Sequence, residues 1–438
     1  MSEGYLQRKA AWEILLKVSS GINSDKALEK TLANYKFNTL DIAFITELSY
    51  GCIRFRRFLD HWIDFTSKLS HEKQPPKLRW LLHIGLYQIL KMNRIPYSAS
   101  ISTTVEIAKK TDLKKLSGVV NAILRNATRK VGSNNTPVFP LDESERIALQ
   151  ESLPIWLVKE MIDWFGVIQT KMIAKTFNRN PKIDLRINLL KTTVDESIKV
   201  FNQNNIDVEI IKDLNSGIVL KSKPRSIKSL PGYIEGKWII QDRSSQWVVP
   251  LLNPKEGDRI LDACSAPGTK TTHLAELIKD RGEILAIDRS ENRLRLLKEN
   301  LERLNIKSVK VFKADAIKLF EIKPNYINYF DKILLDVPCS GIGTLSRNPD
   351  ARWKLSINKI KQLISIQEKL LENIIPLLNK NGSFVYSTCT ICPDENNLLI
   401  KKFLNKNKKL ELVFEKQILP SDFESGDGFY AAKICYKK

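Results

Sequence analysis

Apolar residues in the first 130 positions recur every three or four residues, which is the spacing of an amphipathic helix. Trp12, Leu15 and Leu16 show this spacing near the start of the stretch. Strict alternation of apolar and polar residues, the pattern of a half-buried strand, does not occur there. The pattern predicts an all-helical domain at residues 1–135, in which the residues that begin at Thr39 are expected to cap a helix.

A polar stretch with one glycine and two prolines, residues 131–140, is typical of a linker. The pattern after it predicts a small α+β domain at residues 145–235, whose element order resembles an RNA-recognition fold. This domain lacks the aromatic strand motifs on which such folds stack bases, so we expect it to serve as scaffolding. Its expected elements are a helix at 153–164, a strand at 184–190, a helix at 194–204 and strands at 208–211 and 218–220.

From about residue 237, short apolar runs bounded by turn residues alternate with amphipathic stretches. Such runs are typical of buried parallel strands. Regular alternation of strand and helix predicts an α/β fold, a doubly wound Rossmann-like sheet with right-handed connections, at residues 236–438. The expected strands are 259–264, 283–288, 309–312, 333–335 and 383–386, and the expected helices are 271–279, 291–305 and 357–378.

An aspartate stands at or near the end of each of the first four strands: Asp262, Asp288, Asp315 and Asp336. A lone aspartate at such a place is usually a helix cap or a turn former. Four are harder to explain in this way, because the carboxyl ends of parallel strands face one crevice in which ligands bind. The acid after the second strand, Asp288, stands where nucleotide-binding folds hydrogen-bond ribose hydroxyls.

The loop after the first strand runs from Cys264 to Lys270 and has the sequence CSAPGTK. It matches neither the glycine pattern of dinucleotide sites nor a phosphate-binding loop, since Thr269 separates Gly268 from Lys270 and no glycine precedes them at the required spacing. NAD and ATP are therefore disfavoured. A single glycine suffices where the backbone approaches a nucleotide-like ligand without a pyrophosphate.

Two cysteines follow successive strands of the third domain, Cys339 after the fourth and Cys389 after the fifth. Taken alone, Cys339 is more simply a buried core residue. Cys389 forms a C-x-x-C pair with Cys392, but zinc needs a second pair that the sequence lacks, and the following proline does not suit a thioredoxin-type motif. In the common strand order the fourth strand lies between the first and the fifth, so both cysteines are expected at one pocket with Asp336 and Lys270.

The composition indicates that the protein binds a polyanionic partner. The chain holds 70 Lys and Arg against 49 Asp and Glu, a net charge of +21. Solubility is the alternative explanation of this excess, but nucleic acid is the commonest partner of so basic a chain. Within the helical domain basic residues gather at 54–57, 109–115 and 125–130, where interleaved aromatic residues favour RNA contact.

Six cysteines in 438 residues do not make a disulfide scaffold. The first residues lack the basic segment and apolar core of a signal peptide. The most apolar stretch, residues 80–90, is shorter than the ~20 residues that span a bilayer. We therefore expect a cytoplasmic protein with reduced thiols, without a membrane partner and without a metal.

Four stretches of the third domain form a specific set: DACSAPGTKTTH at 262–273, DVPCSGIG at 336–343, RNPD at 347–350 with Trp353, and YSTCTI at 386–391 followed by Pro393, Glu395 and Asn396. Together they resemble RNA cytosine-5 methyltransferases of the Fmu/Sun family. Thr269 departs from the family pattern, which commonly has glycine there. In the first domain, ELSYG at 47–51 and VNAILR at 120–125 resemble a NusB-like RNA-binding domain.

The resemblance implies S-adenosyl-L-methionine as cofactor and methylation of C5 of a cytosine in 16S ribosomal RNA of the small subunit. In this family the cysteine of the Thr-Cys motif, here Cys389, adds to C6 of the base, and that of the Pro-Cys motif, Cys339, assists product release. Analogy with DNA cytosine methyltransferases would instead make Cys339 the nucleophile. Asp336 is expected to polarise the base at N3, and Lys270 to orient it or balance charge. The expected cofactor-binding residues are Cys264, Ser265, Ala266, Pro267, Gly268, Thr269, Lys270, Asp288, Asp315 and Asp336.

Two other functions are compatible with the sequence. One is the same chemistry on another nucleic acid, transfer RNA or DNA. The other is a non-catalytic RNA-binding factor of ribosome assembly, in which the methyltransferase fold is vestigial. The intact cysteines, loop and strand-end acids favour the enzyme.

Overall fold

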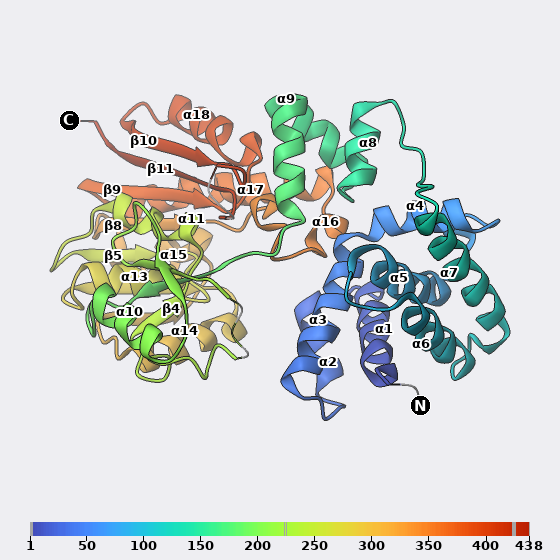
Figure 1. The fold of residues 1–438 in the computed structure, drawn as a ribbon. Helices are drawn as coiled ribbons and strands as arrows, with labels where there is room; N and C mark the ends of the chain where they lie inside the picture. Colours follow the sequence, from blue (N-terminus) through green and yellow to red (C-terminus); the bar gives the residue numbers. More distant parts are fainter. Residues whose placement is uncertain (1–2, 223, 225, 423–425, 438) are drawn as a thin grey trace. The chain divides into compact units, whose positions relative to one another are not determined.

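The structure, a computed structural model, describes residues 3–222, 224, 226–422 and 426–437. The chain forms two compact units, shown in Figure 1. Unit 1 comprises Met1–Asn178 together with Arg347–Lys354, and unit 2 comprises Arg179–Ser346 together with Leu355–Lys438. Among the described helices, none combines the length and apolar character that crossing a bilayer requires.

Unit 1 is helical, as the apolar spacing predicts. Its core centres on α5, in which every residue from Trp80 to Ile89 is buried. The cap of α3 differs from the prediction: the Asn38 side chain accepts a hydrogen bond from the Asp41 amide at 2.9 Å, so Thr39 is the first residue of the helix. The helices are α1 (Tyr5–Ser19), α2 (Ser24–Leu32), α3 (Thr39–Arg54), α4 (Arg56–Thr66), α5 (Pro76–Lys91), α6 (Tyr97–Lys109), α7 (Ser117–Gly132), α8 (Glu143–Gln150), α9 (Ile155–Phe177) and α16 (Ala351–Lys354).

Helix α9 consists of two helical parts. Gly166 interrupts it with φ 75° and ψ 167°, a conformation that favours glycine. The predicted helix ending at Trp164 corresponds to the first part, and the second part continues to Phe177.

Unit 2 begins with a small antiparallel sheet of strand order β2-β3-β1-β4. Its core contains Phe201 and Trp238. Strand β4 was not predicted; it is defined by its antiparallel pairing with β1, about 50 residues earlier in the chain. The elements are β1 (Ile183–Ile187), α10 (Val194–Gln203), β2 (Val208–Ile210), β3 (Gly217–Leu220) and β4 (Trp238–Ile240).

The larger sheet of unit 2 has, within the described residues, seven strands in the order β10-β11-β9-β8-β5-β6-β7. The predicted doubly wound fold is confirmed, and so is the position of β8 between β5 and β9. The last two strands were not predicted, and they run antiparallel to their neighbours. The strands are β5 (Arg259–Asp262), β6 (Glu283–Asp288), β7 (Val309–Lys313), β8 (Phe330–Asp336), β9 (Leu378–Thr388), β10 (Leu410–Ile418) and β11 (Phe429–Tyr436).

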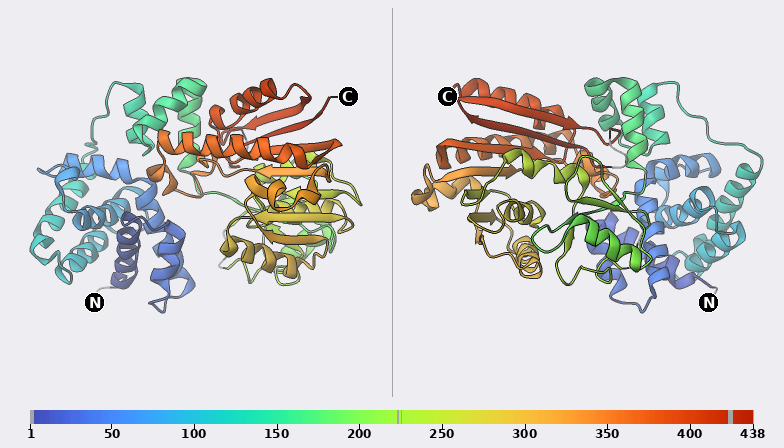
Figure 2. Two further views of the ribbon diagram at one scale, coloured as in Figure 1. Left: turned by 180° about the vertical axis from the view of Figure 1, so that it is seen from behind. Right: turned by 60° about the vertical axis from the view of Figure 1, so that its left-hand side comes forward.

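Helices cover both faces of this sheet, as Figures 1 and 2 show. Leu371 and Phe403 pack on one face from α17 and α18. Leu274 and Leu297 pack on the other face from α13 and α14. The remaining helices of unit 2 are α11 (Arg243–Gln246), α12 (Val248–Leu252), α13 (Thr269–Leu277), α14 (Glu291–Leu304), α15 (Leu319–Ile322), α17 (Ile357–Ile374) and α18 (Asn397–Lys406).

Candidate active site

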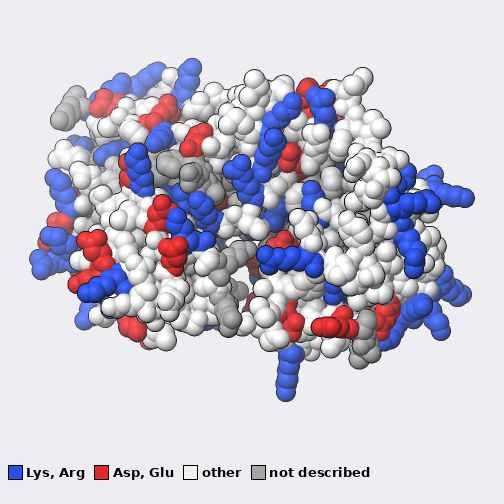
Figure 3. Space-filling view, viewed as in Figure 1, with Lys and Arg blue, Asp and Glu red and all other residues white. Residues whose placement is uncertain are grey.

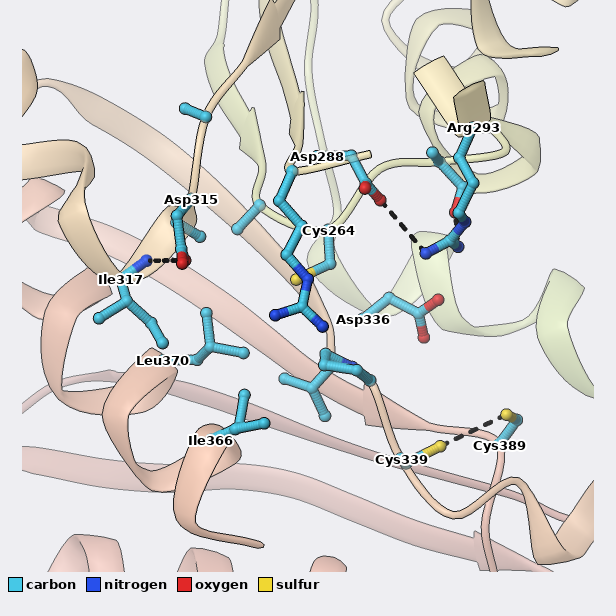
Figure 4. A pocket seen from close by; sticks show the side chains of 17 residues that line it. Cys264, Asp288, Arg293, Asp315, Ile317, Asp336, Cys339, Ile366, Leu370 and Cys389 are labelled. Carbon is cyan, nitrogen blue, oxygen red and sulfur yellow. Dashed lines mark hydrogen bonds and ion pairs between the residues drawn. The ribbon is translucent and has the colours of Figure 1, made fainter. Parts of the chain in front are cut away.

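A pocket of about 250 Å³ lies at the carboxyl ends of the parallel strands, where the strand-end acids were expected to meet. Asp288, Asp315 and Asp336 line it after β6, β7 and β8. Figure 4 shows Asp315 at one end of the pocket and the two cysteines at the other, with Asp336 on the side of the cysteines. The other lining residues are Ala263, Cys264, Ala266, Arg289, Arg293, Ala314, Ala316, Ile317, Val337, Pro338, Cys339, Ile366, Leu370 and Cys389.

Asp336 is held by two neighbours at the end of β8. Lys270, on the first turn of α13, approaches one carboxylate oxygen with Nζ at 2.8 Å. The Ser387 hydroxyl of β9 donates to the other oxygen at 2.8 Å. Lys270 also lies over the Phe429 ring, 4.9 Å from its centroid. These contacts fix the orientation of the carboxylate while leaving it on the pocket wall.

The sulfurs of Cys339 and Cys389 are 3.4 Å apart, within hydrogen-bond distance for two sulfur atoms (Figure 4). The hydrogen bond to Cys389, and then burial, raise the pKa of the Cys339 thiol well above its usual value. Cys339 is therefore a neutral thiol near neutral pH. Its proton can point at the Cys389 sulfur and stabilise negative charge there.

The loop that carries Cys339 is fastened by a buried carboxylate that the prediction did not assign to the site. One Glu395 oxygen accepts hydrogen bonds from the Ser340 amide and from Gln367 Nε2, both at 2.9 Å. The Ser340 hydroxyl donates to the other oxygen. Glu395 follows Cys389 in the same stretch, so this network joins the two cysteine-bearing loops. Burial raises the pKa of Glu395.

The far half of the pocket combines acidic and apolar groups. Asp288 accepts a hydrogen bond from the Ser290 amide at 2.8 Å and lies 3.4 Å from the Arg293 guanidinium. Asp315 accepts from the Ile317 amide at 3.0 Å. Apolar side chains of Ile317 and, from α17, Ile366 and Leu370 line the wall beside Asp315.

The CSAPGTK loop follows β5 and is tied to β6. The Ser265 amide and hydroxyl both donate to the Ile287 carbonyl, at 2.9 and 3.0 Å. Gly268 has φ 105°, and a Cβ atom there would lie 2.3 Å from Leu297. The positive φ therefore favours glycine at this position, and a larger residue would also require the Leu297 side chain to move. Thr269 begins α13 and is half-buried.

Two groups at the start of the loop, buried Asp262 and half-buried Cys264, have raised pKa values. Burial raises the pKa of Asp262 to about 7, although Thr271 donates to this carboxylate at 2.7 Å. Burial also raises the pKa of Cys264. Cys264 is thus held as a neutral thiol in the pocket wall.

The structure brings together most of the residues expected to form the site. Cys264, Ala266, Asp288, Asp315, Asp336, Cys339 and Cys389 line the pocket, and Lys270 reaches it through Asp336. Ser265, Pro267, Gly268 and Thr269 shape the loop without lining the pocket. Sequence reasoning missed Arg293, Ser387 and Glu395 as members of the site. Ser387 lies within the YSTCTI motif and Glu395 four residues after it, so the sequence carried a signal for these two residues and none for Arg293.

The described cysteines form no disulfide. Cys392, the second member of the C-x-x-C pair, is buried, and burial raises its pKa to about 12. Among the described residues, no group of three or more His, Cys, Asp or Glu side chains is arranged to hold a metal ion.

Family models match three consecutive parts of the chain. Residues 6–129 match the NusB family, residues 153–227 match a ferredoxin-like domain of RsmF/B-like methyltransferases, and residues 249–435 match the 16S rRNA methyltransferase RsmB/F model.

Curated relatives are similar over most of the chain. A probable ribosomal RNA small subunit methyltransferase B of Synechocystis is 40% identical over 88% of this chain and 85% of its own length. A protein with the same description from Bacillus subtilis is 33% identical over 98% of each chain.

Solved structures are similar as well. The crystal structure of PH0851 has 25% identity and a TM-score of 0.83 over 99% of each chain. A methyltransferase homolog from Pyrococcus horikoshii has 29% identity and a TM-score of 0.59, over 66% of this chain and 98% of its own.

Proposed function

Because the chain belongs to the RsmB/F family of 16S ribosomal RNA methyltransferases, we propose that it methylates C5 of a cytosine in small-subunit ribosomal RNA through a covalent cysteine adduct. One observation carries this proposal most directly. Two thiols lie 3.4 Å apart, on the loops after β8 and β9, and share a pocket with a fixed carboxylate. The cofactor of this family is S-adenosyl-L-methionine.

The pocket residues fit this cofactor. Asp288 offers a buried carboxylate at the end of the second parallel strand, where ribose hydroxyls are usually bound. Asp315 and the apolar group of Ile317, Ile366 and Leu370 suit a purine ring with its exocyclic amine. Bound there, S-adenosyl-L-methionine would supply an electrophilic methyl group.

Cys389 is the proposed nucleophile. Its thiolate adds to C6 of cytosine, so a carbon–sulfur bond forms and the electrons of the C5–C6 double bond move towards N3, which makes C5 nucleophilic. The Cys339 thiol lies 3.4 Å from the attacking sulfur and can donate a hydrogen bond to it.

Asp336 has the role of stabilising this electron shift. A carboxyl group that shares a proton with N3 neutralises the charge that develops on the ring. Ser387 and Lys270 hold Asp336 from two sides, so the group does not have to reorganise during the reaction. Lys270 balances the carboxylate charge when the base is absent.

Cys339 has the role of assisting product release. C5 takes the methyl group, which leaves S-adenosyl-L-homocysteine as the co-product. The C5 proton then leaves to water, the proton on N3 returns to Asp336, the C5–C6 double bond forms again, and the carbon–sulfur bond breaks to expel the Cys389 thiolate. A hydrogen bond from Cys339 stabilises the departing sulfur. The target base must leave any stack to reach these groups.

We also propose a division of labour along the chain: a NusB-like RNA-binding domain at residues 1–135, a small α+β domain at 145–235 and a methyltransferase domain at 236–438. The three matched family models follow this order.

A test uses 16S ribosomal RNA transcripts, S-adenosyl-L-methionine and denaturing gels that separate protein–RNA adducts. We expect Cys389→Ser to lose both methylation and the adduct, and Cys339→Ser to accumulate an adduct that turns over slowly. Adducts with Cys389→Ser but none with Cys339→Ser would show that the two roles are inverted.

Two further measurements separate the alternative functions. Calorimetry with S-adenosyl-L-methionine distinguishes an enzyme from a non-catalytic assembly factor, which would not bind it. Bisulfite sequencing of ribosomal RNA from a strain that lacks this protein, compared with its parent, would identify the cytosine. An unchanged 16S pattern would point to transfer RNA or another substrate.

A further inference from the structure

The RNPD motif and Trp353 belong to unit 1, although the residues on either side of this segment belong to unit 2. Asp350 accepts hydrogen bonds from the Ser24 amide and hydroxyl at 3.2 and 2.9 Å. Trp353 Nε1 donates to the Ile53 carbonyl at 2.7 Å. The segment Arg347–Lys354 is therefore a fixed part of the helical unit.

This segment completes a pocket of about 430 Å³, large enough for one nucleotide. The pocket lies among the end of α1, the start of α4, the start of α5 and the segment itself. None of its lining residues is shared with the cofactor pocket. The lining residues are Val18, Ser19, Gly21, Ile53, Arg56, Glu72, Gln74, Pro76, Arg79, Trp80, Asp350, Trp353 and Lys354.

Arg56 is the unusual member of this pocket. Its guanidinium carbon lies over the rings of Trp80 and Trp353, 5.5 and 5.4 Å from their centroids. Across the described part of the chain it has no hydrogen-bond acceptor within bonding distance and no ion-pair partner. Its side chain is partly buried, and burial and the neighbouring Arg79 lower its pKa. A guanidinium group whose N–H donors have no acceptor in the protein favours an anionic ligand.

The other lining cations already have partners. Arg79 forms a bidentate ion pair with Asp60, and the Asp60 carboxylate is also hydrogen-bonded to His83. Lys354 lies 2.8 Å from Asp350. Asp60 raises the pKa of Arg56 through its charge, but neither carboxylate forms a hydrogen bond with Arg56. Glu72, exposed in the short segment before α5, is the remaining acid of the lining.

We propose that this pocket binds a phosphodiester group of the RNA substrate, with Arg56 as its anchor. The two indole rings hold the guanidinium in place, so that little side-chain entropy is lost when it binds a phosphate. The paired Lys354 and Arg79 add positive potential at the same site. RNA is favoured over an acidic peptide because it is the polyanion that the family's enzymes act on, and the inference rests to this extent on the proposed function.

The test measures binding of a 16S ribosomal RNA transcript to the full-length protein across a range of salt concentrations. We expect Arg56→Ala to weaken binding roughly tenfold. We also expect it to reduce the slope of log affinity against log salt by about 0.7 to 0.9, the loss of one phosphate contact. Arg56→Lys should keep the slope and recover only part of the affinity, because it keeps the charge without the planar fork.

A steric variant and a matched control keep the test independent of folding effects. Ser19 is exposed on the pocket wall, so Ser19→Trp should weaken RNA binding while leaving Arg56 intact. Lys36→Ala removes one exposed charge outside the pocket and should change affinity much less. The proposal would be overturned if both Arg56→Ala and Ser19→Trp bound RNA with wild-type affinity and wild-type salt slope. It would also be overturned if these substitutions weakened the binding of a nucleoside monophosphate but not the binding of RNA.

Measurements of enzymatic turnover distinguish a failure of this inference from a failure of the proposed function. In an active enzyme, Arg56→Ala should raise KM for RNA and leave kcat and the affinity for S-adenosyl-L-methionine close to wild type. If the wild-type protein fails to methylate any RNA, the proposed function fails, while the binding measurements still decide the role of Arg56.

Discussion

At the scale of single residues, Asp262 has the most informative environment. It ends β5, is 1% exposed and bears a carboxyl group whose pKa burial raises to about 7. An unfolded aspartate has a pKa of about 3.9. The folded protein therefore binds this proton more tightly than the unfolded chain does. Stability from this group is greatest below about pH 4 and is lost progressively as the pH rises to about 7.

Asp262→Asn should remove this pH dependence, because asparagine is neutral at every pH and can still accept from Thr271. We expect the variant to gain in thermal stability relative to wild type between pH 5 and pH 8, by up to about 4 kcal/mol. Melting temperatures of both proteins across that range would show it. A constant difference from pH 5 to pH 8 would contradict the assignment.

Thr269 shows how a departure from a family pattern can be accommodated. It stands outside the pocket lining, and its carbonyl accepts hydrogen bonds from Arg186 at 2.7 Å and from Thr272 at 3.0 Å. Gly268 before it provides the positive φ that the turn requires. A side chain at 269 therefore does not narrow the pocket.

At the scale of elements, Arg186 connects the small sheet to the start of α13. It lies on β1 with no exposed surface, and its guanidinium bonds both oxygens of Glu276 on α13, at 3.0 and 2.8 Å. It also donates to Gln241 and to the first turn of α13. These contacts hold the small sheet against the start of α13, where Lys270 lies.

Arg186→Met should destabilise the protein by about 3 to 5 kcal/mol, because it leaves the Glu276 carboxylate buried without its partner. Adding Glu276→Leu should recover much of this loss, since the buried charge is then removed as well. Arg281→Met is the matched control, because Arg281 pairs with Glu256 at the surface and should cost no more than about 1 kcal/mol. Thermal unfolding measures the stability of all three variants relative to wild type. Additive losses in the double variant would argue against the pairing.

At the scale of the whole molecule, the net charge of +21 is the dominant property. On the face that Figure 3 shows, Lys and Arg are spread over both units, and Asp and Glu lie between them. Such a surface suits many separate phosphate contacts better than a single basic groove.

RNA binding should therefore depend steeply on salt. Neutralising ~6 phosphates gives a slope of log affinity against log salt of about −4 to −5. Filter binding of a 16S ribosomal RNA transcript between low and physiological salt measures this slope. A flat titration would contradict an electrostatic RNA-binding surface.

The sequence predicted those features that depend on neighbours along the chain. The apolar spacing of three and four residues predicted the helical unit, and the alternation of strands and helices predicted the doubly wound sheet. It did not predict β10 and β11: β10 carries charged residues along an exposed edge, so its apolar pattern is weak, and its pairing with β11 joins residues up to 26 positions apart.

The sequence alone thus indicated most of the candidate site residues, because each motif is a short local pattern at the end of a strand. The tertiary structure decided which of them meet. Cys339 and Cys389 are 50 residues apart along the chain and 3.4 Å apart in space because β8 and β9 are adjacent parallel strands. Arg186 reaches Glu276 across 90 residues, and Arg347–Lys354 folds with the helical unit instead of with its neighbours in the sequence. Contacts of this kind depend on strand order and packing, which local spacing does not encode.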